Sequence, residues 1–393
     1  MIYIFLLSAF LTIAIIISLF GAKSRILSPM PLHMLPWLLV MILGGASYDY
    51  FNEFTEKTFH GLLIWLSVLF FFYFFSDYYN SGCNGISVRI NEVEYKSGRY
   101  WLVVIPLSIY IVYEIYTVGI GGPSHFFLNL RLANTMDDYT GPKFRVMTAV
   151  YPMIMAMFAI VCVTKTSALT KYSIVFCVIL FCIGTMGKFA VITPVLVFLV
   201  IYDFKKKLNI KKLLLFSFFI VGVALALHFV RMANNDEATI SSVLGLYLYS
   251  PIIAFGQLNQ VVSNHTGEFT FRFIYALFNK LNFINEQPVN TILDYVYVPI
   301  PTNVYTVMQP FYQDYGYIGI FFGALFYGAV FSGLYTFAIR GSILSLLTYA
   351  LLSISSVTAF LGETLITNFS GNIKLVLCLI ILWCSTVKCK RRQ

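Results

Sequence analysis

Long apolar blocks separated by polar loops constrain this chain more than any other feature of its sequence. Most blocks run for about 14 to 22 residues, and about 20 apolar residues let a helix cross the hydrocarbon layer of a bilayer. Runs such as residues 62–75 show none of the alternation that transmembrane β-strands need. We therefore predict an all-α polytopic membrane protein, which agrees with 59% hydrophobic and only 11% charged residues.

We expect about eleven transmembrane helices and one large loop between the eighth and the ninth of them. The expected spans are residues 2–20, 31–47, 58–76, 100–117, 147–164, 172–186, 189–203, 213–230, 317–338, 342–361 and 373–387. The chain is thus predicted to divide into a first bundle (1–230), the large loop (231–316) and a second bundle (317–393). Residues 241–262 within the loop are also apolar, and we interpret them as an interfacial or re-entrant helix broken at Pro251.

Basic residues indicate how the chain is oriented, because loops rich in Lys and Arg stay on the cytoplasmic side. Alternate loops hold 17 of the 26 basic residues, including the clusters 205–212 and 388–392. We therefore expect the amino terminus outside and the carboxyl terminus inside. The formal net charge of +9 follows from this arrangement, so it gives no support for nucleic-acid binding. In this predicted topology none of the seven cysteines lies in an outer loop, so neither a disulfide nor a zinc site is predicted.

The outer side nevertheless holds cations that suit a phosphate group. Residues 172–203 read as a hairpin of two short helices, whose apex 184–188 places Lys188 at the start of the second helix, where backbone N–H groups also point outward. Arginine binds phosphate oxygens through two parallel hydrogen bonds. We propose a lipid-diphosphate site made of Lys188, Arg231, Arg272, Arg131 and Arg145. For any single one of them the alternative is ordinary contact with lipid headgroups or loop salt bridges.

A transport function is less well supported than an enzymatic one. Ion-coupled carriers usually place ionisable residues at mid-membrane depth and repeat their broken helices in two matching halves. Only Glu114 lies inside an expected span, where it either pairs within the bundle or approaches the sugar path, and no halves correspond. His33 and His228 fall at span ends and are predicted to be interfacial. The polar residues instead collect in the loop of about 85 residues, which is far longer than loops without a function usually are.

The end of that loop carries the most informative pattern in the chain. Pro301, Asn303 and Tyr305 form a Pro-x-Asn-x-Tyr motif, and Tyr312, Asp314, Gly316 and Gly319 form Tyr-x-Asp-x-Gly-x-x-Gly at the entry to a span. With Gly-x-x-Gly-Lys at the hairpin apex and the segment 249–255, these motifs resemble the bacterial oligosaccharide repeat-unit polymerases, the O-antigen polymerase (Wzy) family. The resemblance in hydropathy extends over nearly the whole chain.

That resemblance implies a fold similar to the C-type glycosyltransferases and a glycosyl transfer without metal or other cofactor at the periplasmic face of the bacterial inner membrane. Its substrates would be a glycan donor and acceptor linked to undecaprenyl diphosphate, with membrane lipids and a chain-length regulator as further partners. The related O-antigen ligases carry His where this chain has Pro301 and Thr302, which disfavours a ligase. A flippase for lipid-linked oligosaccharides is the alternative from another functional class.

We predict roles for the remaining polar residues of this loop from their type and position. Asp314 lies two residues before Gly316, where the loop returns to the membrane, and is our candidate for the carboxylate that accepts the proton of the acceptor hydroxyl. The alternative is that Asp314 only caps the helix from Tyr317 or pairs with an arginine. Asn303, Tyr305, Tyr249 and His265 are candidate glycan-binding residues.

Overall fold

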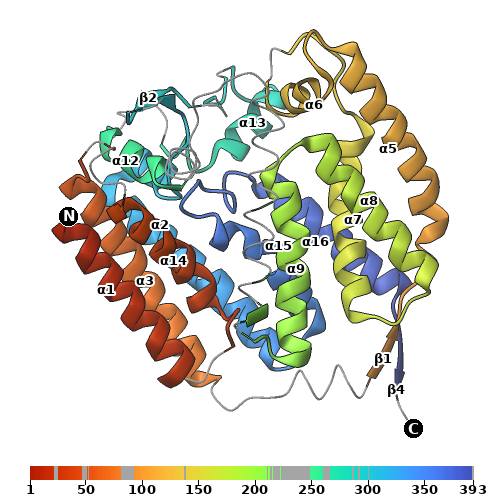
Figure 1. Ribbon diagram of the computed structural model, residues 1–393, viewed down its shortest axis with the longest axis horizontal. Helices are drawn as coiled ribbons and strands as arrows, with labels where there is room; N and C mark the ends of the chain where they lie inside the picture. The colour runs from red at the N-terminus through yellow and green to blue at the C-terminus, as the bar shows by residue number, and fades with distance from the viewer. Residues whose placement is uncertain are drawn as a thin grey trace. The chain divides into compact units, whose positions relative to one another are not determined.

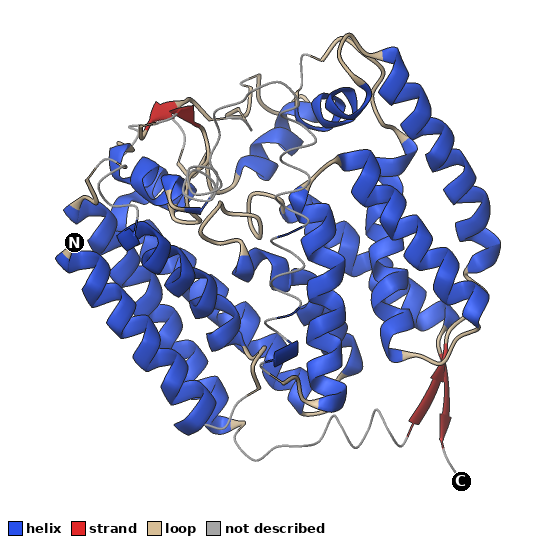
Figure 2. Ribbon diagram, viewed as in Figure 1, coloured by secondary structure: helices blue, strands red, loops and turns tan. Residues whose placement is uncertain are grey.

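The computed structural model describes residues 1–21, 25–46, 51, 53–80, 93–136, 139–209, 211–212, 215, 222, 248–259, 266–285, 287–290, 293–299 and 301–391. Nearly all regular structure in these residues is helical, and the strands form two short pairs (Figure 2). Among the described residues, eight helices are long and apolar enough to cross a membrane by length and composition. The predicted all-α polytopic class is therefore confirmed.

Eight of the eleven expected spans coincide with these helices, namely α1 (Ile2–Ile16, continued by the π-helix η1, Ile17–Gly21), α2 (Pro29–Ala46), α3 (Glu56–Tyr79), α5 (Trp101–Gly121), α7 (Val146–Val163), α8 (Ala168–Thr185), α14 (Gln309–Ile339) and α16 (Phe369–Thr386). Two others are also helices, α9 (Lys188–Lys206) and the shorter α15 (Ile343–Val357). The expected span 213–230 lies almost wholly outside the described residues.

The chain forms two compact units, each assembled from separate stretches of sequence. Unit 1 comprises Met1–Cys83, Glu237–Ile339 and Ser355–Asn372, and unit 2 comprises Asn84–Asp236, Arg340–Ile354 and Ile373–Gln393. The predicted division at residues 230 and 316 concerns which parts lie in the membrane, and it stays a prediction.

Unit 1 is built on a packed pair, α3 and α14, beside the pair α1 and α2 (Figure 1). The shorter elements α12 (Ser250–Gln257), α13 (Arg272–Lys280) and the antiparallel strands β2 (Val296–Tyr297) and β3 (Pro301–Thr302) also belong to it. Helix α3 starts at Thr55, whose side chain accepts a hydrogen bond from the Thr58 N–H at 3.2 Å, the usual way a threonine caps a helix.

The interior of unit 1 corrects one prediction. His33 is fully buried, and its Nε2 accepts a hydrogen bond from the Trp65 indole at 3.1 Å. The rings of Tyr73 and Tyr327 lie close to the imidazole. The prediction that His33 is interfacial is therefore wrong, because neighbouring helices cover the first turns of α2 with aromatic side chains. His228 lies outside the described residues.

Unit 2 contains α5, α7, α8 and α9, with α6 (Phe126–Thr135) packed against α5 and α8. Strands β1 (Val93–Lys96) and β4 (Lys388–Arg391) pair antiparallel, and Lys96 also forms a bridge with Lys165 (Figure 1). Three basic segments that the sequence assigns to the cytoplasm, at residues 93–99, 165–171 and 388–391, thus meet at one end of this unit.

The loops of unit 1 are also grouped by the side of the membrane to which the sequence assigns them. Asn80, at the end of α3, donates to Thr336 Oγ1 near the end of α14 at 2.9 Å, and Asp77 accepts from Ser18 at 2.6 Å. These are the ends predicted to face the cytoplasm. At the other end, Phe51 packs against Tyr249 with ring centroids 5.2 Å apart. In each unit, loops that the charge rule places on the same side therefore lie at the same end.

Candidate functional site

The Pro-x-Asn-x-Tyr motif is fixed at one end of unit 1 by backbone contacts. Pro301 pairs with Tyr297 across strands β3 and β2. The Val307 N–H donates to the Ala359 carbonyl at 2.7 Å, and the Tyr305 hydroxyl donates to the Asp294 carbonyl at 2.9 Å. Burial raises the pKa of the Tyr305 phenol, and the nearby Asp294 carboxylate raises it further, so this hydroxyl remains protonated at the pH of the cell.

The second motif forms a kinked helix start. Helix α14 is interrupted at Gly316, whose φ of 62° and ψ of −144° suit glycine. A Cβ atom at Gly319 would lie 2.1 Å from the Phe311 carbonyl oxygen. The motif therefore needs glycine at both positions, one for the backbone angle and one for the close approach of two turns.

Asp314 holds a neighbouring loop against this kink. One carboxylate oxygen accepts the Phe269 N–H at 3.2 Å, and the other accepts the Thr270 N–H at 2.7 Å. Asp314 thus binds the backbone of the segment just before α13, a role that differs from the two structural alternatives considered from sequence. Each carboxylate oxygen has a second lone pair, so these bonds leave it able to accept a proton from a substrate.

Arg272 begins α13, two residues beyond Thr270. Its Nε donates to the Val289 carbonyl at 2.6 Å, which fixes the guanidinium against the segment 287–290. The same short stretch of chain, residues 269–272, therefore carries both the partner of the candidate base and one of the predicted diphosphate-binding arginines.

The two tyrosines predicted to bind the glycan are buried. Tyr249 is 1% exposed, packs against Phe51 and lies so close to Gly44 that a Cβ there would meet its ring at 2.0 Å. Tyr305 is 4% exposed. Tyr305 thus bonds the backbone at Asp294, Tyr249 packs inside unit 1, and Asn303 is half-buried. His265, the remaining candidate for glycan binding, lies outside the described residues.

Unit 2 gathers three of the five predicted diphosphate-binding residues. Asn134 of α6 donates to the Gly184 carbonyl at 3.1 Å, so the helix that carries Arg131 lies on the hairpin apex. The apex turns at Met186, in the left-handed conformation with φ of 46°, and α9 begins at Lys188. No side-chain hydrogen bond from Gly187, the residue before α9, caps this helix start, and the amino end of a helix is where an anion is bound most favourably.

Arg145 joins this cluster through Glu114. The buried Glu114 carboxylate accepts the N–H groups of Arg145 at 2.7 Å, Val146 at 3.0 Å and Met147 at 2.8 Å. It therefore caps α7 from the neighbouring helix α5. A Cβ at Gly184 would lie 2.6 Å from the Met147 sulfur, which places the start of α7 beside the hairpin apex. Arg131, Arg145 and Lys188 thus share one end of unit 2, which we name the cation cluster.

The remaining two predicted phosphate ligands are placed differently. Arg272 belongs to unit 1, and Arg231 lies outside the described residues.

Sequence reasoning missed the structural role of Asn129, which accepts the Ser124 N–H at 2.9 Å and donates to the Gly119 carbonyl at 2.9 Å. The Pro123–Ser124 turn before a short helix was the available signal, because an asparagine near such a turn often bonds its backbone.

Comparison with known proteins gives one informative similarity. The chain is 28% identical over 287 residues to a putative O-antigen polymerase of Escherichia coli (strain K12), and the match covers 71% of each protein. It supports the resemblance to the O-antigen polymerase family that the loop motifs indicated. The search against protein-family models found no match. The search against solved structures found none either.

Proposed function

We propose that this protein polymerises oligosaccharide repeat units carried on undecaprenyl diphosphate, building O-antigen or a similar surface polysaccharide. The observation that carries the proposal is the segment 301–319, in which each residue of the two motifs shared with the family lies at one end of unit 1. There Asp314 and Tyr305 bind neighbouring backbone and the two glycines shape the kink. The similarity to the putative O-antigen polymerase supports the same conclusion.

The reaction would take place at the periplasmic face of the inner membrane. In each unit, the loops that the charge rule assigns to the outside share one end. The motif segment lies at that end of unit 1, and the cation cluster lies at that end of unit 2. Together with the charge rule, this grouping favours the amino terminus outside and the carboxyl terminus in the cytoplasm.

The cation cluster would bind the diphosphate of the lipid carrier. Arg131, Arg145 and Lys188 supply positive charge, and the amino end of α9 adds the favourable end of its helix dipole. Such donors stabilise negative charge that develops on a leaving group. Arg231 and Arg272 remain proposed contributors to diphosphate binding.

The chemistry would be a glycosyl transfer that needs no metal or other cofactor. A hydroxyl oxygen of the acceptor sugar forms a bond to the anomeric carbon of the donor, and the bond from that carbon to the diphosphate breaks. Asp314 accepts the hydroxyl proton, while undecaprenyl diphosphate leaves with the bonding electrons. Asn303, Tyr305, Tyr249 and His265 are proposed to position the glycan. The buried Tyr305 would act through the backbone that it bonds, and the buried Tyr249 through its packing.

Deleting the gene in its own host tests this function against its alternatives. We expect lipopolysaccharide with a single repeat unit on the lipid core, restored to long polymer by the intact gene. An O-antigen ligase or a flippase would instead leave a core without glycan. The polymer's modal length in the restored strain would also respond to removal of a chain-length regulator, if such a partner acts on this protein.

A further inference from the structure

The amino end of α3 carries a polar and aromatic patch that includes only Tyr312 among the motif residues. It consists of Glu56, Lys57 and His60 from α3 with Tyr312 and Tyr317 from α14, and we name it the α3 patch. Tyr312 and Asp314 are two residues apart on a helix and so point to opposite sides. The α3 patch therefore uses the side of the motif segment that faces away from the candidate base.

Contacts among these residues fix the patch in place. The Lys57 ammonium donates to the Leu258 carbonyl at the end of α12 and lies 5.6 Å from the centre of the Tyr312 ring. The rings of Tyr312 and Tyr317 meet edge to face at 5.5 Å, and the His60 ring meets that of Tyr317 in the same way at 6.4 Å.

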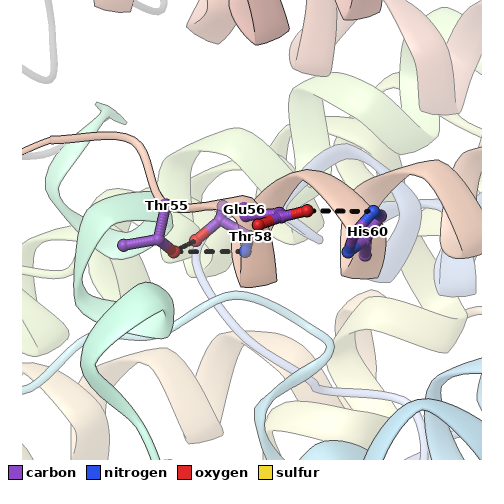
Figure 3. A network of polar contacts seen from close by, with 4 residues as sticks. All are labelled: Thr55, Glu56, Thr58 and His60. Atoms are coloured by element: carbon purple, nitrogen blue, oxygen red, sulfur yellow. Dashed lines mark hydrogen bonds and ion pairs between the residues drawn. The ribbon is translucent and has the colours of Figure 1, made fainter.

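Glu56 and His60 form a polar pair on the outer surface of α3. Figure 3 shows the two side chains pointing toward one another along the helix. The distance between Glu56 Oε1 and His60 Nε2 is 4.0 Å. Thr55, which caps the helix, also bonds Thr58, so the first turn that carries Glu56 is well anchored. The pair is open to ligands, because the side chain of Glu56 is 72% and that of His60 48% exposed.

This combination matches the chemistry of a sugar. A pyranose has a face of C–H groups that packs against an aromatic ring, whose π face is negative, and an edge of hydroxyls that both donate and accept hydrogen bonds. Tyr317 is 37% exposed, unlike the buried Tyr249 and Tyr305. A carboxylate accepts from hydroxyls, and an imidazole can donate to or accept from them.

The main rival is an aromatic belt at the surface of the membrane, where tyrosines often lie at the level of the lipid headgroups. The exposed carboxylate of Glu56 argues against that role, because it would face the negative charge of phospholipid headgroups. Neutral sugar hydroxyls, in contrast, hydrogen-bond to a carboxylate without such repulsion. The observations therefore favour a glycan over a lipid surface.

We propose that the α3 patch is a subsite for the growing glycan, with Tyr317 stacking on a sugar ring and Glu56 and His60 bonding its hydroxyls. The identity of that glycan rests on the proposed function. Because the patch lies on the far side of the motif segment from Asp314, it holds sugars already joined to the polymer. Loss of the subsite therefore releases the chain early and shortens the polymer, while the joining of repeat units continues.

Binding of an isolated glycan tests the subsite directly. The probe is an oligosaccharide of two to three repeat units released by mild acid from the lipopolysaccharide of the host, titrated against the full-length protein in nanodiscs. We expect each of two variants to weaken binding about fivefold or more: Tyr317→Ala, which removes the stacking ring, and Glu56→Gln, which replaces charge-assisted hydrogen bonds by weaker neutral ones. Tyr317→Phe keeps the ring and most of the affinity. Tyr172→Ala, which removes an exposed tyrosine from α8, serves as the matched control.

The outcomes separate the subsite from the proposed reaction. If the wild-type protein joins repeat units but Tyr317→Ala and Glu56→Gln bind the glycan as tightly as the control, the subsite is wrong. No measurable binding to the wild-type protein contradicts it equally. The Tyr317→Ala protein would fail to insert into the membrane if Tyr317 were a residue of an aromatic belt. In that case Glu56→Gln decides, and unchanged glycan binding by this variant contradicts the subsite. The wild-type protein could also bind the glycan, less tightly in the variants, and yet join no repeat units. That result supports the subsite and contradicts the proposed reaction.

Discussion

At the scale of single residues, several carboxylates in the described part of the chain bind backbone N–H groups. Glu114 caps α7, Asp314 holds residues 269 and 270, and Glu363 accepts the N–H groups of Leu365 at 2.7 Å, Ile366 at 2.8 Å and Thr367 at 2.5 Å. A carboxylate far from water is stable only where donors surround it. For Asp314 the consequence is a fixed position beside the kink, which a proton acceptor also needs.

Asp314→Asn tests whether its carboxylate takes part in the reaction. Asparagine keeps one oxygen that can accept an N–H of residue 269 or 270, but it cannot accept the proton of an acceptor hydroxyl. We expect a folded, membrane-inserted protein whose polymerisation falls by ~10² or more, the lower end of what general-base catalysis contributes. Polymer of near-normal amount and length would leave Asp314 with only its structural role and shift attention to Glu268, Asp294 and His265.

Lys188 provides the matching test of the cation cluster. Lys188 is the first residue of α9, and a charge-assisted contact from its ammonium to diphosphate would contribute roughly 1.5 to 3 kcal/mol. Lys188→Ala should therefore slow turnover about tenfold or more, measured as repeat units joined per unit time at matched expression. Lys374→Ala, which removes an exposed lysine near the start of α16, is the control. Equal rates for both variants would show that Lys188 binds no phosphate.

At the scale of the elements, helix existence was predictable because long apolar runs leave few alternatives. The bounds of α2, of α7 and of α1 with its continuation η1 fall within two residues of the expected spans. The packing partners were not predictable. His33 reads as a polar residue at a span end, yet aromatic rings from other helices enclose it. Tyr249 and Tyr305 read as exposed aromatics of a loop, yet both are buried. Burial depends on which elements meet, and apolar periodicity does not specify that.

Glu114 shows the same limit and yields a prediction about the joint between α5 and α7. Glu114→Ala would leave three N–H groups at the buried start of α7 without their acceptor, which should cost about 3 kcal/mol. We expect the apparent unfolding temperature of the purified protein to fall by several degrees, with a smaller fall for Glu114→Gln. Glu53→Ala, which removes an exposed carboxylate, is the control. If Glu114→Ala were as stable as this control, water would be replacing the carboxylate as the acceptor of the three N–H groups.

At the scale of the whole molecule, the sequence predicted which loops share a side, and the structure groups them accordingly within each unit. Residues 93–96 and 388–391 pair as strands although nearly 300 residues separate them, and both were assigned to the cytoplasm by charge. The orientation of the protein in a membrane remains a prediction from the charge rule.

Cysteine labelling can measure this orientation. Single cysteines placed at Asn209 and His265, in a variant without native cysteines, would be exposed to a membrane-impermeant thiol reagent in intact spheroplasts. We expect labelling at residue 265 and protection at residue 209, because the Lys205–Lys212 cluster should face the cytoplasm. The reverse labelling pattern would contradict the predicted topology and place the candidate sites on the cytoplasmic side.

The most direct test of the proposed function is the reaction itself. The purified protein in nanodiscs would be incubated with undecaprenyl-diphosphate-linked repeat units from its host, with a chelator present and without any other protein. We predict lipid-linked products of two and more repeat units, with one undecaprenyl diphosphate released for each bond formed. Unchanged single-unit substrate, under conditions in which the protein binds that substrate, would contradict the account.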